Sequence, residues 1–556
     1  MNGTNNLTKK RMVFAYPQSN YYFPTGILDH LGLRMLAGKI EQTLKEVEVR
    51  VLLQAGFRLS TKEMIAEILE SDPLLVGISP TMMSWGVCKT IAEEVKEALP
   101  FAHVVMGGHL ATFVPREILQ NSRADSVVVG YGCDPIVQLA KSVLQKTLPW
   151  KVDSLYWRNG SRIIANPVGK CLRELSVLPS MEPIGRLTGN AFLPAATATT
   201  SIGCPNNCEF CTTAAMGRLY ACPYRQMDVE MVLEQIKRLA DAGIEYFLFT
   251  DDNLFQSREA RARAAAISEG MMQGHIKINF AFMATAIDLT NPANLGLLRL
   301  MKRAGAIGVL VGAEAATPES LRYLGKAARV TTSSANIDVS DLLRREELLM
   351  LATFININPY STVQSLEANA RALLRMGTAT FANLTSALMI LPGTETTRKA
   401  REAGILLPSY NPLSTPYDYK IFDNRVEPFA RALLAMRYWS NPAVGDILGL
   451  AMDGLYLSFG LAMRRQGLAE LEAPRSREQQ LNFNFFMKGL ELAQDGWDSE
   501  VWKAAVGEYN RIAGSMRLKL REKHGHYLPP FFIRSSIRRK KLYFEPRIEW
   551  RIEKMR

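Results

Sequence analysis

The run Cys204-Pro205-Asn206-Asn207-Cys208-Glu209-Phe210-Cys211 places three cysteines at C-x3-C-x2-C spacing on one short segment. Soft thiolate ligands suit iron-sulfur clusters and zinc. Three thiolates can hold three corners of a four-iron four-sulfur cluster, which leaves the fourth iron open to a substrate or cofactor. A structural zinc needs a fourth ligand, and Cys222 lies 11 residues further on. Structural cysteines without a metal are the other alternative.

The sequence around this segment predicts a barrel. A β-like run at 195–202 precedes the cysteines, and a long helical stretch at 229–242 follows them. Helical stretches such as 258–272 and 366–376 then alternate with strand candidates at 246–250, 276–283, 307–311, 351–357 and 380–388. Because βα crossovers are right-handed, six such units predict a partial (β/α)6 barrel of the TIM type.

A strand, a cysteine loop and a helix in this order resemble the opening of a radical S-adenosylmethionine (SAM) barrel. The cysteine spacing, Phe210 before the last cysteine and Gly203 before the first all match that superfamily. The resemblance implies a [4Fe-4S] cluster on Cys204, Cys208 and Cys211, with SAM bound at the open iron and Phe210 beside the cofactors. It also implies that the reduced cluster cleaves SAM into methionine and a 5′-deoxyadenosyl radical.

Functional residues of such barrels lie at the carboxyl ends of the strands. The sequence offers Thr250-Asp251-Asp252-Asn253, Gly312-Ala313-Glu314 and Leu391-Pro392-Gly393-Thr394-Glu395 there. The resemblance implies that Asp252, Asn253 and Glu314 face the amino, carboxylate or ribose groups of SAM. Helix capping is the alternative for Asp251 and Asp252. Relatives commonly have glycine where Asn358 precedes Pro359, so we expect asparagine to tolerate an unusual backbone angle there.

The N-terminal third predicts a doubly wound, Rossmann-like parallel sheet. Short apolar runs separated by amphipathic helical stretches are typical of strands covered on both faces. The runs occupy 12–16, 47–53, 74–79, 103–106 and 126–129, and the clearest helical stretches occupy 62–70 and 88–99. In such sheets the ligand lies beyond the carboxyl ends of the strands.

Those strand ends resemble the cobalamin-binding domain. They read Ser79-Pro80-Thr81-Met82, Gly107-Gly108-His109 and Gly130-Tyr131-Gly132. The resemblance implies cobalamin contacts from nine of these residues: Ser79, Thr81, Met82, Gly107, Gly108, His109, Gly130, Tyr131 and Gly132. Ordinary turn chemistry at strand ends is the alternative.

One hallmark of the cobalamin domain, the Asp-x-His-x-x-Gly loop, is missing. Asp29 and His30 are adjacent, within a predicted helix, and do not fit that spacing. We therefore expect base-off cobalamin with no histidine below the metal. The expected lower-face neighbours are Met82, Met83 or Trp85, and Cys133 is a further candidate to face the cobalamin.

The domain organisation expected from these patterns has four parts. A cobalamin-binding domain spans 1–150, a linker 151–190, the radical SAM barrel 191–405 and a helical C-terminal domain 406–556. Helical stretches at 428–438, 447–465, 477–495 and 500–523 predict a cap over the barrel mouth. Such a cap would shield a radical from water.

Composition excludes several classes of protein. With 47% apolar and 22% charged residues among 556, wholesale disorder, collagen-like repeats and a disulfide-dense scaffold do not fit. An odd count of seven cysteines and a polar start without a signal peptide favour the cytoplasm. The apolar stretch 447–463 contains Asp453 and falls short of a membrane-spanning helix.

Half of the net charge of +12 lies in the last 28 residues, 529–556, where nine Lys/Arg oppose three Glu. Aromatic residues are interleaved with these charges, so the tail suits an anionic membrane surface or nucleic acid. A tail packed on its own domain is the favoured alternative. Because the excess is local, nucleic acid is not an expected partner of the catalytic domains.

Together the two resemblances predict a cobalamin-dependent radical SAM enzyme that methylates an unactivated carbon through methylcobalamin and a 5′-deoxyadenosyl radical. Cyclisation, ring contraction or rearrangement without net methyl transfer is the alternative reaction. A non-catalytic cobalamin or iron-sulfur sensor is the alternative of another class. The expected partners are a substrate of unknown kind (small molecule, peptide or lipid) and an external electron donor such as flavodoxin or ferredoxin.

Overall fold

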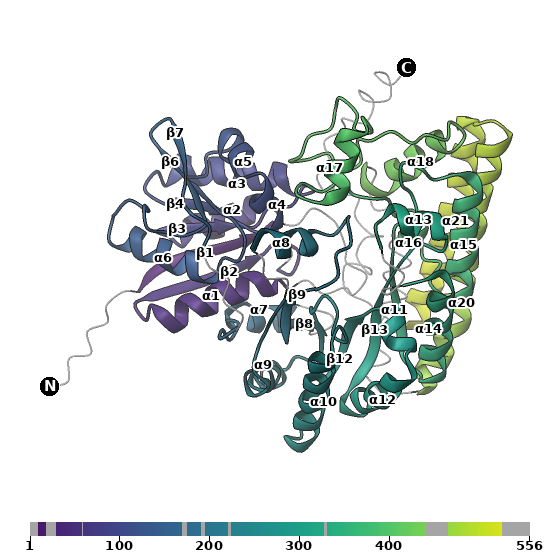
Figure 1. Cartoon of the computed structure of the whole chain (residues 1–556), viewed down its shortest axis with the longest axis horizontal. Coiled ribbons are helices and arrows are strands. Elements are labelled where there is room, and N and C mark those ends of the chain that lie inside the picture. Colours follow the sequence, from purple (N-terminus) through teal and green to yellow (C-terminus); the bar gives the residue numbers. More distant parts are fainter. Residues whose placement is uncertain are drawn as a thin grey trace.

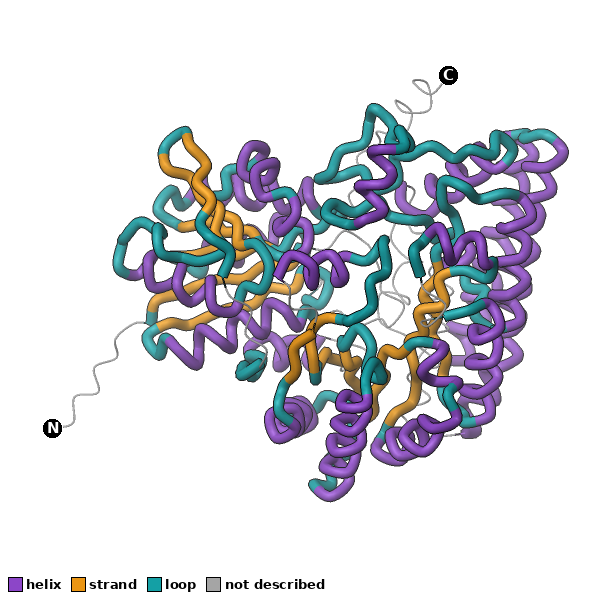
Figure 2. The backbone as a smooth tube through the Cα atoms, in the orientation of Figure 1, coloured by secondary structure: helices purple, strands orange, loops and turns teal. Residues whose placement is uncertain are grey.

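The computed structural model describes residues 9–17, 29–57, 59–169, 175–190, 195–220, 224–326, 331–439 and 465–524. Figure 1 shows the first sheet with its helices on one side, the barrel strands in the middle, and the long C-terminal helices along the opposite side. Figure 2 shows the strands as two separate groups. The α/β class predicted from the sequence is confirmed.

The first sheet has the predicted doubly wound topology. Its parallel strands are β1 (Lys10–Tyr16), β2 (Val47–Leu53), β3 (Leu75–Ile78), β4 (His103–Met106) and β5 (Ser126–Val128), in the order β2-β1-β3-β4-β5. Every residue of β3 is buried, as expected for a strand covered on both faces. The helices of this part are α1 (Leu31–Thr43), α2 (Thr61–Glu70), α3 (Trp85–Ala98), α4 (His109–Phe113), α5 (Pro115–Asn121) and α6 (Cys133–Leu144).

The expected linker 151–190 is partly wrong, because the sheet continues beyond residue 150. The hairpin β6 (Leu155–Asn159) and β7 (Arg162–Ala165) pairs antiparallel with β5 and extends the sheet. Its apolar anchor is Trp157, which is 2% exposed and donates its indole N–H to Asn166. The helix α7 (Glu182–Asn190) then leads toward the barrel.

The second sheet is an open half-barrel of five parallel strands. They are β8 (Ala195–Ala198), β11 (Tyr246–Phe249), β12 (Asn279–Ala284), β13 (Ala306–Glu314) and β14 (Leu349–Phe354), in the order β14-β13-β12-β11-β8. A short antiparallel pair, β9 (Ser201–Gly203) and β10 (Tyr224–Gln226), stands beside β8. The accompanying helices are α8 (Thr212–Tyr220), α9 (Val229–Asp241), α10 (Arg258–Gln273), α11 (Ala286–Thr290), η1 (Pro292–Asn294), α12 (Leu295–Ala304), α13 (Pro318–Tyr323), α14 (Ser333–Arg345) and α15 (Val363–Arg375).

The sixth strand predicted at 380–388 is wrong in its first half. The short helix α16 (Phe381–Leu384) forms there instead. Thr380 accepts the Asn383 N–H with its hydroxyl, and the Asn383 side chain donates to the Thr378 carbonyl. These local hydrogen bonds compete with a strand. What remains of the strand is one parallel bridge between Ile357 and Ala387.

The C-terminal helices pack against the flank of the barrel rather than over its mouth, so the expected cap is corrected for the described residues. These helices are α18 (Val426–Leu434), η2 (Ala435–Trp439), α20 (Arg465–Asp495) and α21 (Ser499–His524). The helix α17 (Glu395–Glu402) lies instead beside the cysteine segment, where the Thr396 N–H donates to the Glu209 carbonyl at 3.1 Å. Gln479 and Asn482 of α20 donate to the carbonyls of Gly377 and Ala379, next to α15 and α16. Figure 1 shows α20 and α21 running beside α15. The predicted helix 447–463 and the basic tail 529–556 lie outside the described residues.

A buried ion pair joins the two sheets. Arg34 of α1 and Asp29 have no exposed side-chain surface, and Arg34 Nη1 lies 2.8 Å from Asp29 Oδ2. The same carboxylate oxygen accepts from the backbone N–H and the hydroxyl of Thr197 in β8, at 2.9 and 2.6 Å. Arg34 also donates to the Thr197 carbonyl. The first strand of the barrel is therefore tied to the first helix of the N-terminal domain.

Candidate functional site

The three cysteines lie on the loop between β9 and α8, at the carboxyl end of the barrel strands. Cys204 follows Gly203 directly, and Cys211 directly precedes α8. All three are half-buried and carry free thiols. Burial raises the pKa of Cys204 to about 12 and that of Cys208 to about 11. Each thiol must lose its proton when it binds iron.

Three free thiols on one loop fit a four-iron cluster by their chemistry. In the described part of the chain, no three His, Cys, Asp or Glu side chains converge on a point that would hold a single metal ion. A four-iron cluster does not need ligands that converge on one point, because each thiolate binds a different iron. Cys222, the fourth ligand of the zinc alternative, lies outside the described residues.

Asp252 holds the two ends of the cysteine loop together. Its Oδ2 accepts the N–H of Gly203 at 3.2 Å, and its Oδ1 accepts the hydroxyl of Thr213 at 2.8 Å. Gly203 comes directly before Cys204, and Thr213 follows Cys211 by two positions. Asp252 is nevertheless exposed, so its carboxylate can also meet a ligand. We call this arrangement the Asp252 clasp.

The neighbours of Asp252 have structural partners. Asp251 is fully buried and accepts from the hydroxyls of Thr200 and Ser201, at 2.6 and 2.5 Å. Burial raises the pKa of Asp251. Asn253 donates to Asp288 at 2.9 Å and accepts the Phe255 N–H.

Helix capping, the alternative for Asp251 and Asp252, is wrong. Ser257 is the N-cap of α10, and its side chain accepts the Ala260 N–H. The two aspartates instead shape the β8–β9 turn and the cysteine loop.

Glu314 ends β13 and is bonded to a residue that the sequence did not single out. Lys326 donates to Glu314 Oε1 at 2.9 Å, and both side chains are buried. No sequence motif near Lys326 predicts this ion pair with Glu314, because 12 residues and a helix separate the two partners. The contact exists only once α13 folds back on the strand end.

The segment that follows β14 has ordinary backbone angles. Neither Asn356 nor Asn358 has a positive φ. The prediction of an unusual backbone angle at Asn358, beside Pro359, is therefore wrong. The asparagines act through their side chains. Asn356 donates to the Leu384 carbonyl at 2.6 Å, and Asn358 accepts the Tyr360 N–H at 2.9 Å.

The predicted cobalamin residues come together at the carboxyl edge of the first sheet. A Cβ on Gly108, whose φ is +95°, would lie 3.0 Å from Ser79 Oγ, so the ends of β3 and β4 touch. Thr112 accepts the Gly130 N–H and donates to the Gly108 carbonyl, both at 2.8 Å. Gly107 precedes Gly108 and His109 begins α4, while Gly132 is the N-cap of α6.

Other predicted cobalamin contacts are engaged inside the protein. Thr81 and Ser84 exchange hydrogen bonds between side chain and backbone in both directions at the start of α3. Met82 and Trp85 are 4% and 7% exposed and pack into the core, whereas Met83 is half-buried. Of these three, Met83 retains the most access to a ligand.

His30 lies just outside α1 rather than within a helix. Its Nδ1 accepts the Leu33 N–H at 3.1 Å, so it is the N-cap. Its ring contacts Tyr16 edge-on at 4.1 Å between centroids. Burial lowers the pKa of His30 to about 4, so the ring is neutral with its proton on Nε2. Neither ring nitrogen then offers a free lone pair to a metal.

Two contacts bring the carboxyl edge of the first sheet, where the predicted cobalamin residues lie, against the barrel mouth. We call this edge the cobalamin edge. A Cβ on Gly130, whose φ is +76°, would lie 1.6 Å from the hydroxyl oxygen of Tyr220, the last residue of α8. A Cβ on Gly393 would lie 2.1 Å from the ring of Phe113 in α4. Figure 1 shows α4, α8 and α17 meeting where the two halves adjoin.

Tyr131 and Tyr220 extend the first of these contacts. Their rings are 5.3 Å apart, and the Arg225 guanidinium lies 3.8 Å from the Tyr131 ring centroid. The sequence did not indicate Tyr220 or Arg225. The available signal was an aromatic residue ending the helix that follows the cysteines.

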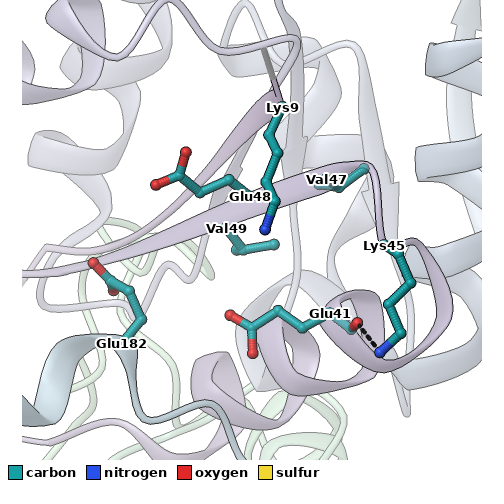
Figure 3. A pocket seen from close by; sticks show the side chains of 7 residues that line it. All are labelled: Lys9, Glu41, Lys45, Val47, Glu48, Val49 and Glu182. Carbon is teal, nitrogen blue, oxygen red and sulfur yellow. Dashed lines mark hydrogen bonds between the residues drawn. The ribbon is translucent and has the colours of Figure 1, made fainter. Parts of the chain in front are cut away.

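A separate hollow of about 330 Å³ lies at the outer edge strand β2 (Figure 3). Its lining mixes acidic, basic and valine side chains: Lys9, Glu41, Lys45, Val47, Glu48, Val49 and Glu182. Glu182 accepts the Val51 N–H at 2.7 Å and so blocks part of the strand edge. None of the predicted site residues lines this hollow.

Comparison with known proteins agrees with both domains. Residues 24–140 match the B12 binding domain, and residues 199–373 match the radical SAM superfamily. An uncharacterised methyltransferase of Pyrococcus horikoshii is 26% identical over 61% of this chain and 72% of its own length. The anaerobic magnesium-protoporphyrin IX monomethyl ester cyclase of Cereibacter sphaeroides is 24% identical over 65% of this chain and 59% of its own length.

Among solved structures, the cobalamin-dependent SAM radical enzyme OxsB with aqua-cobalamin and SAM bound is similar. It is 15% identical, with a TM-score of 0.71 over 95% of this chain and 84% of that one. This likeness is one of fold. In the described part of the chain, no helix is long and apolar enough to cross a membrane. With its B12-binding and radical SAM domains, which imply cobalamin, a [4Fe-4S] cluster and SAM, the chain is a cobalamin-dependent radical SAM enzyme.

Proposed function

We propose that the enzyme methylates an unactivated carbon of its substrate and that cobalamin carries the methyl group. The observation that carries this proposal is the contact between the two cofactor edges. Tyr220 ends the helix that follows the cysteine loop, and its ring fills the space above Gly130. An enzyme whose two cofactors act on one substrate needs such adjacency.

When bound, the cluster supplies the electron that cleaves SAM, and the corrin supplies the methyl group. Cys204, Cys208 and Cys211 would hold the cluster, and the Asp252 clasp fixes the shape of their loop. The backbone at Gly108 and Gly130 lets the corrin approach closely. Tyr220 and Phe113 lie between the two edges, where they would help to exclude water from the space in which the substrate carbon reacts.

The methyltransferase relative from Pyrococcus horikoshii favours methyl transfer. Cyclisation is the second candidate, because a cyclase relative matches 65% of this chain. Both reactions use the same cysteine loop. They differ in whether SAM also donates its methyl group.

The decisive experiment follows the methyl group. Reconstituted enzyme with cobalamin and a reductant receives SAM labelled in its methyl carbon, first alone and then with candidate substrates. Methyl transfer predicts label on cobalamin together with S-adenosylhomocysteine, and then label in the product alongside 5′-deoxyadenosine. Formation of 5′-deoxyadenosine without S-adenosylhomocysteine or labelled cobalamin would instead favour cyclisation.

We propose in addition that a flavodoxin or ferredoxin delivers the electron in the cytoplasm, and that the tail 529–556 adds a contact to anionic membranes. The substrate class (small molecule, peptide or lipid) stays open in this proposal. Reduction of the cluster by purified flavodoxin tests the donor. Sedimentation of full-length and tail-truncated enzyme with vesicles containing phosphatidylserine tests the membrane contact. Equal sedimentation of both forms would reject it.

A further inference from the structure

Three aromatic side chains gather on the surface at the carboxyl end of the barrel. Tyr323 ends α13, Tyr360 lies in the loop between β14 and α15, and Phe422 lies between α17 and α18. The rings of Tyr360 and Phe422 stack with centroids 5.1 Å apart, and the Tyr323 ring meets that of Tyr360 edge-on at 4.8 Å. Tyr360 is 50% exposed and Phe422 is 51% exposed. We call these three residues the aromatic patch. Contiguous exposed apolar surface of this kind marks a binding site more strongly than single exposed residues do.

The backbone under the aromatic patch is fixed by hydrogen bonds. The Phe422 N–H donates to the Pro359 carbonyl at 2.9 Å, which ties Phe422 to the loop after β14. The Tyr360 N–H donates to the buried Asn358 side chain, and the Asn358 N–H donates to the buried Ser361 hydroxyl, both at 2.9 Å. A patch held in this way needs little ordering when a partner binds.

The inner end of the aromatic patch adjoins the cysteine loop. Tyr323 is two positions before Gly325, and a Cβ on Gly325 would lie 2.2 Å from the Glu209 side chain. Burial raises the pKa of Tyr323, and the nearby Tyr360 and Glu209 add to this rise. Glu209 directly follows Cys208. A short path therefore runs from the exposed rings through Tyr323 and Glu209 to the middle cysteine.

The ion pairs around the aromatic patch present their positive members to water. Arg425 is 51% exposed, whereas its partner Asp423 is 12% exposed. Lys399 is 52% exposed, whereas its partner Glu209 is 26% exposed. In both pairs the basic group reaches further into solvent than the acidic group does. A partner that approaches this surface therefore meets the positive charges first.

Two further basic residues lie next to the aromatic patch in the sequence. Arg322 directly precedes Tyr323, and Lys420 is two positions before Phe422. Both are exposed. Arg322 pairs with the exposed Glu319 at 3.1 Å, so this pair adds no net charge, whereas Lys420 adds one positive charge. We call Arg322, Lys399, Lys420 and Arg425 the basic rim.

We infer that the aromatic patch and its basic rim dock a small acidic electron-carrier protein, which passes one electron to the cluster at the cysteine loop. The carrier is oxidised by one electron, the cluster is reduced by one electron, and no bond forms or breaks. Aromatic anchors within a polar rim are typical of protein interfaces, and interfaces of electron carriers are small. Complementary charge brings such a partner to the surface quickly. This inference rests on the proposed function, because cleavage of SAM requires that electron.

The test compares two ways of reducing the anaerobically reconstituted holoenzyme. Purified flavodoxin and purified ferredoxin, each in its reduced form, are the carriers. Dithionite is the small reductant, which needs no docking surface. Loss of the visible absorbance of the cluster gives the reduction rate, and titration of flavodoxin with the enzyme gives the binding affinity.

The double variant Tyr360→Ser, Phe422→Ser should bind the carrier roughly 10- to 100-fold more weakly, as expected when aromatic anchors are truncated. Its reduction by the carrier should slow accordingly, while dithionite should reduce it at the wild-type rate. Phe101→Ser is the matched control, because Phe101 is 59% exposed in the loop between α3 and β4. That control should behave as the wild type does. An unchanged rate with the carrier in the double variant, or equal slowing with dithionite, would overturn the inference.

A charge reversal tests the basic rim without altering the aromatic patch. Arg322→Glu should slow reduction by the carrier several-fold at low salt, and the difference should shrink at high salt. Lys503→Glu is the matched control, because Lys503 in α21 is 69% exposed and pairs with Glu500 at the same spacing as Arg322 with Glu319. Equal effects of the two reversals would overturn the assignment of an acidic carrier to this surface.

Other occupants of the aromatic patch give different results. Sedimentation of the wild type and the double variant, with and without phosphatidylserine vesicles, measures self-association and membrane binding. Loss of either one with unchanged reduction by the carrier would assign the patch to a second copy or to a membrane, and would overturn the inference. Failure of both carriers to reduce the wild type would overturn it too. Methyl transfer measured with dithionite as the reductant tests the proposed function separately.

Discussion

The cobalamin edge and the cluster edge, which is the carboxyl edge of the barrel sheet beside the cysteine loop, differ in the kinds of residue that form them. Both are the carboxyl ends of parallel strands. The cobalamin edge is made of glycines, with Gly108 and Gly130 at positive φ and few charges. The cluster edge is made of charged side chains, among them the buried Asp251, Glu314 and Lys326. A large flat ligand requires backbone that can approach it closely. A small charged ligand requires fixed charges.

The largest effect should come from Cys204, Cys208 and Cys211, because they are the proposed iron ligands at the cluster edge. The triple variant Cys204→Ala, Cys208→Ala, Cys211→Ala should lose the cluster completely. Anaerobic reconstitution should give about four iron per chain in the wild type and none in the variant, as expected for the loss of all its thiolates. Cobalamin binding, measured by its base-off absorbance, should survive in the variant. A wild-type iron content in this variant would contradict the assignment of the cluster to these three cysteines.

At the cobalamin edge, adding one methyl group should be enough to disrupt binding. In Gly130→Ala the new Cβ would overlap the Tyr220 ring, and the positive φ adds strain of roughly 1 kcal/mol. We expect cobalamin affinity to fall about tenfold or more, since 1.4 kcal/mol is a factor of ten. Absorbance titration measures this.

The double variant Gly130→Ala, Tyr220→Ala separates the two causes. It relieves the overlap and leaves the strain, so it should recover part of the affinity. No loss of affinity in Gly130→Ala would show that this edge does not depend on glycine.

The Asp252 clasp should depend on hydrogen bonds rather than on charge. Asp252→Ala removes both bonds and should lose cluster iron to a chelator several-fold faster than the wild type. Asn accepts from Gly203 and donates to the Thr213 hydroxyl, so Asp252→Asn should stay close to the wild type. Thr213→Val removes one bond and should be intermediate. Asn and Ala variants that lose iron equally fast would show that the charge matters instead.

The smallest effect concerns pH at the cobalamin edge. The folded-state pKa of His30 is about 4, below the value of about 6.5 expected in an unfolded chain. Stability from the neutral ring is therefore present above pH 6.5 and is lost as pH falls toward 4. We expect up to about 1 kcal/mol of loss between pH 7 and pH 5.5. His30→Asn keeps the N-cap without titrating, so its urea midpoint should change less; equal changes would contradict the assignment.

The first sheet could be predicted well, because its strands are short continuous apolar runs between amphipathic helices. All five parallel strands appear within two residues of their expected bounds. The hairpin at 155–165 was missed, since an antiparallel edge pair leaves only a brief alternating signal. The strand expected at 380–388 became α16 because Thr380 and Asn383 satisfy the local backbone, which apolar pattern alone does not reveal.

The sequence by itself determined the cysteine ligands and the glycine turns, because ligand spacing and positive φ are local properties of the chain. Only the tertiary structure brought Lys326 to Glu314, Tyr220 to Gly130, and both Arg34 and Asp29 to Thr197. These contacts join residues 12 to 168 positions apart. Their cause is packing between separate elements, and burial then decides which charges must find partners.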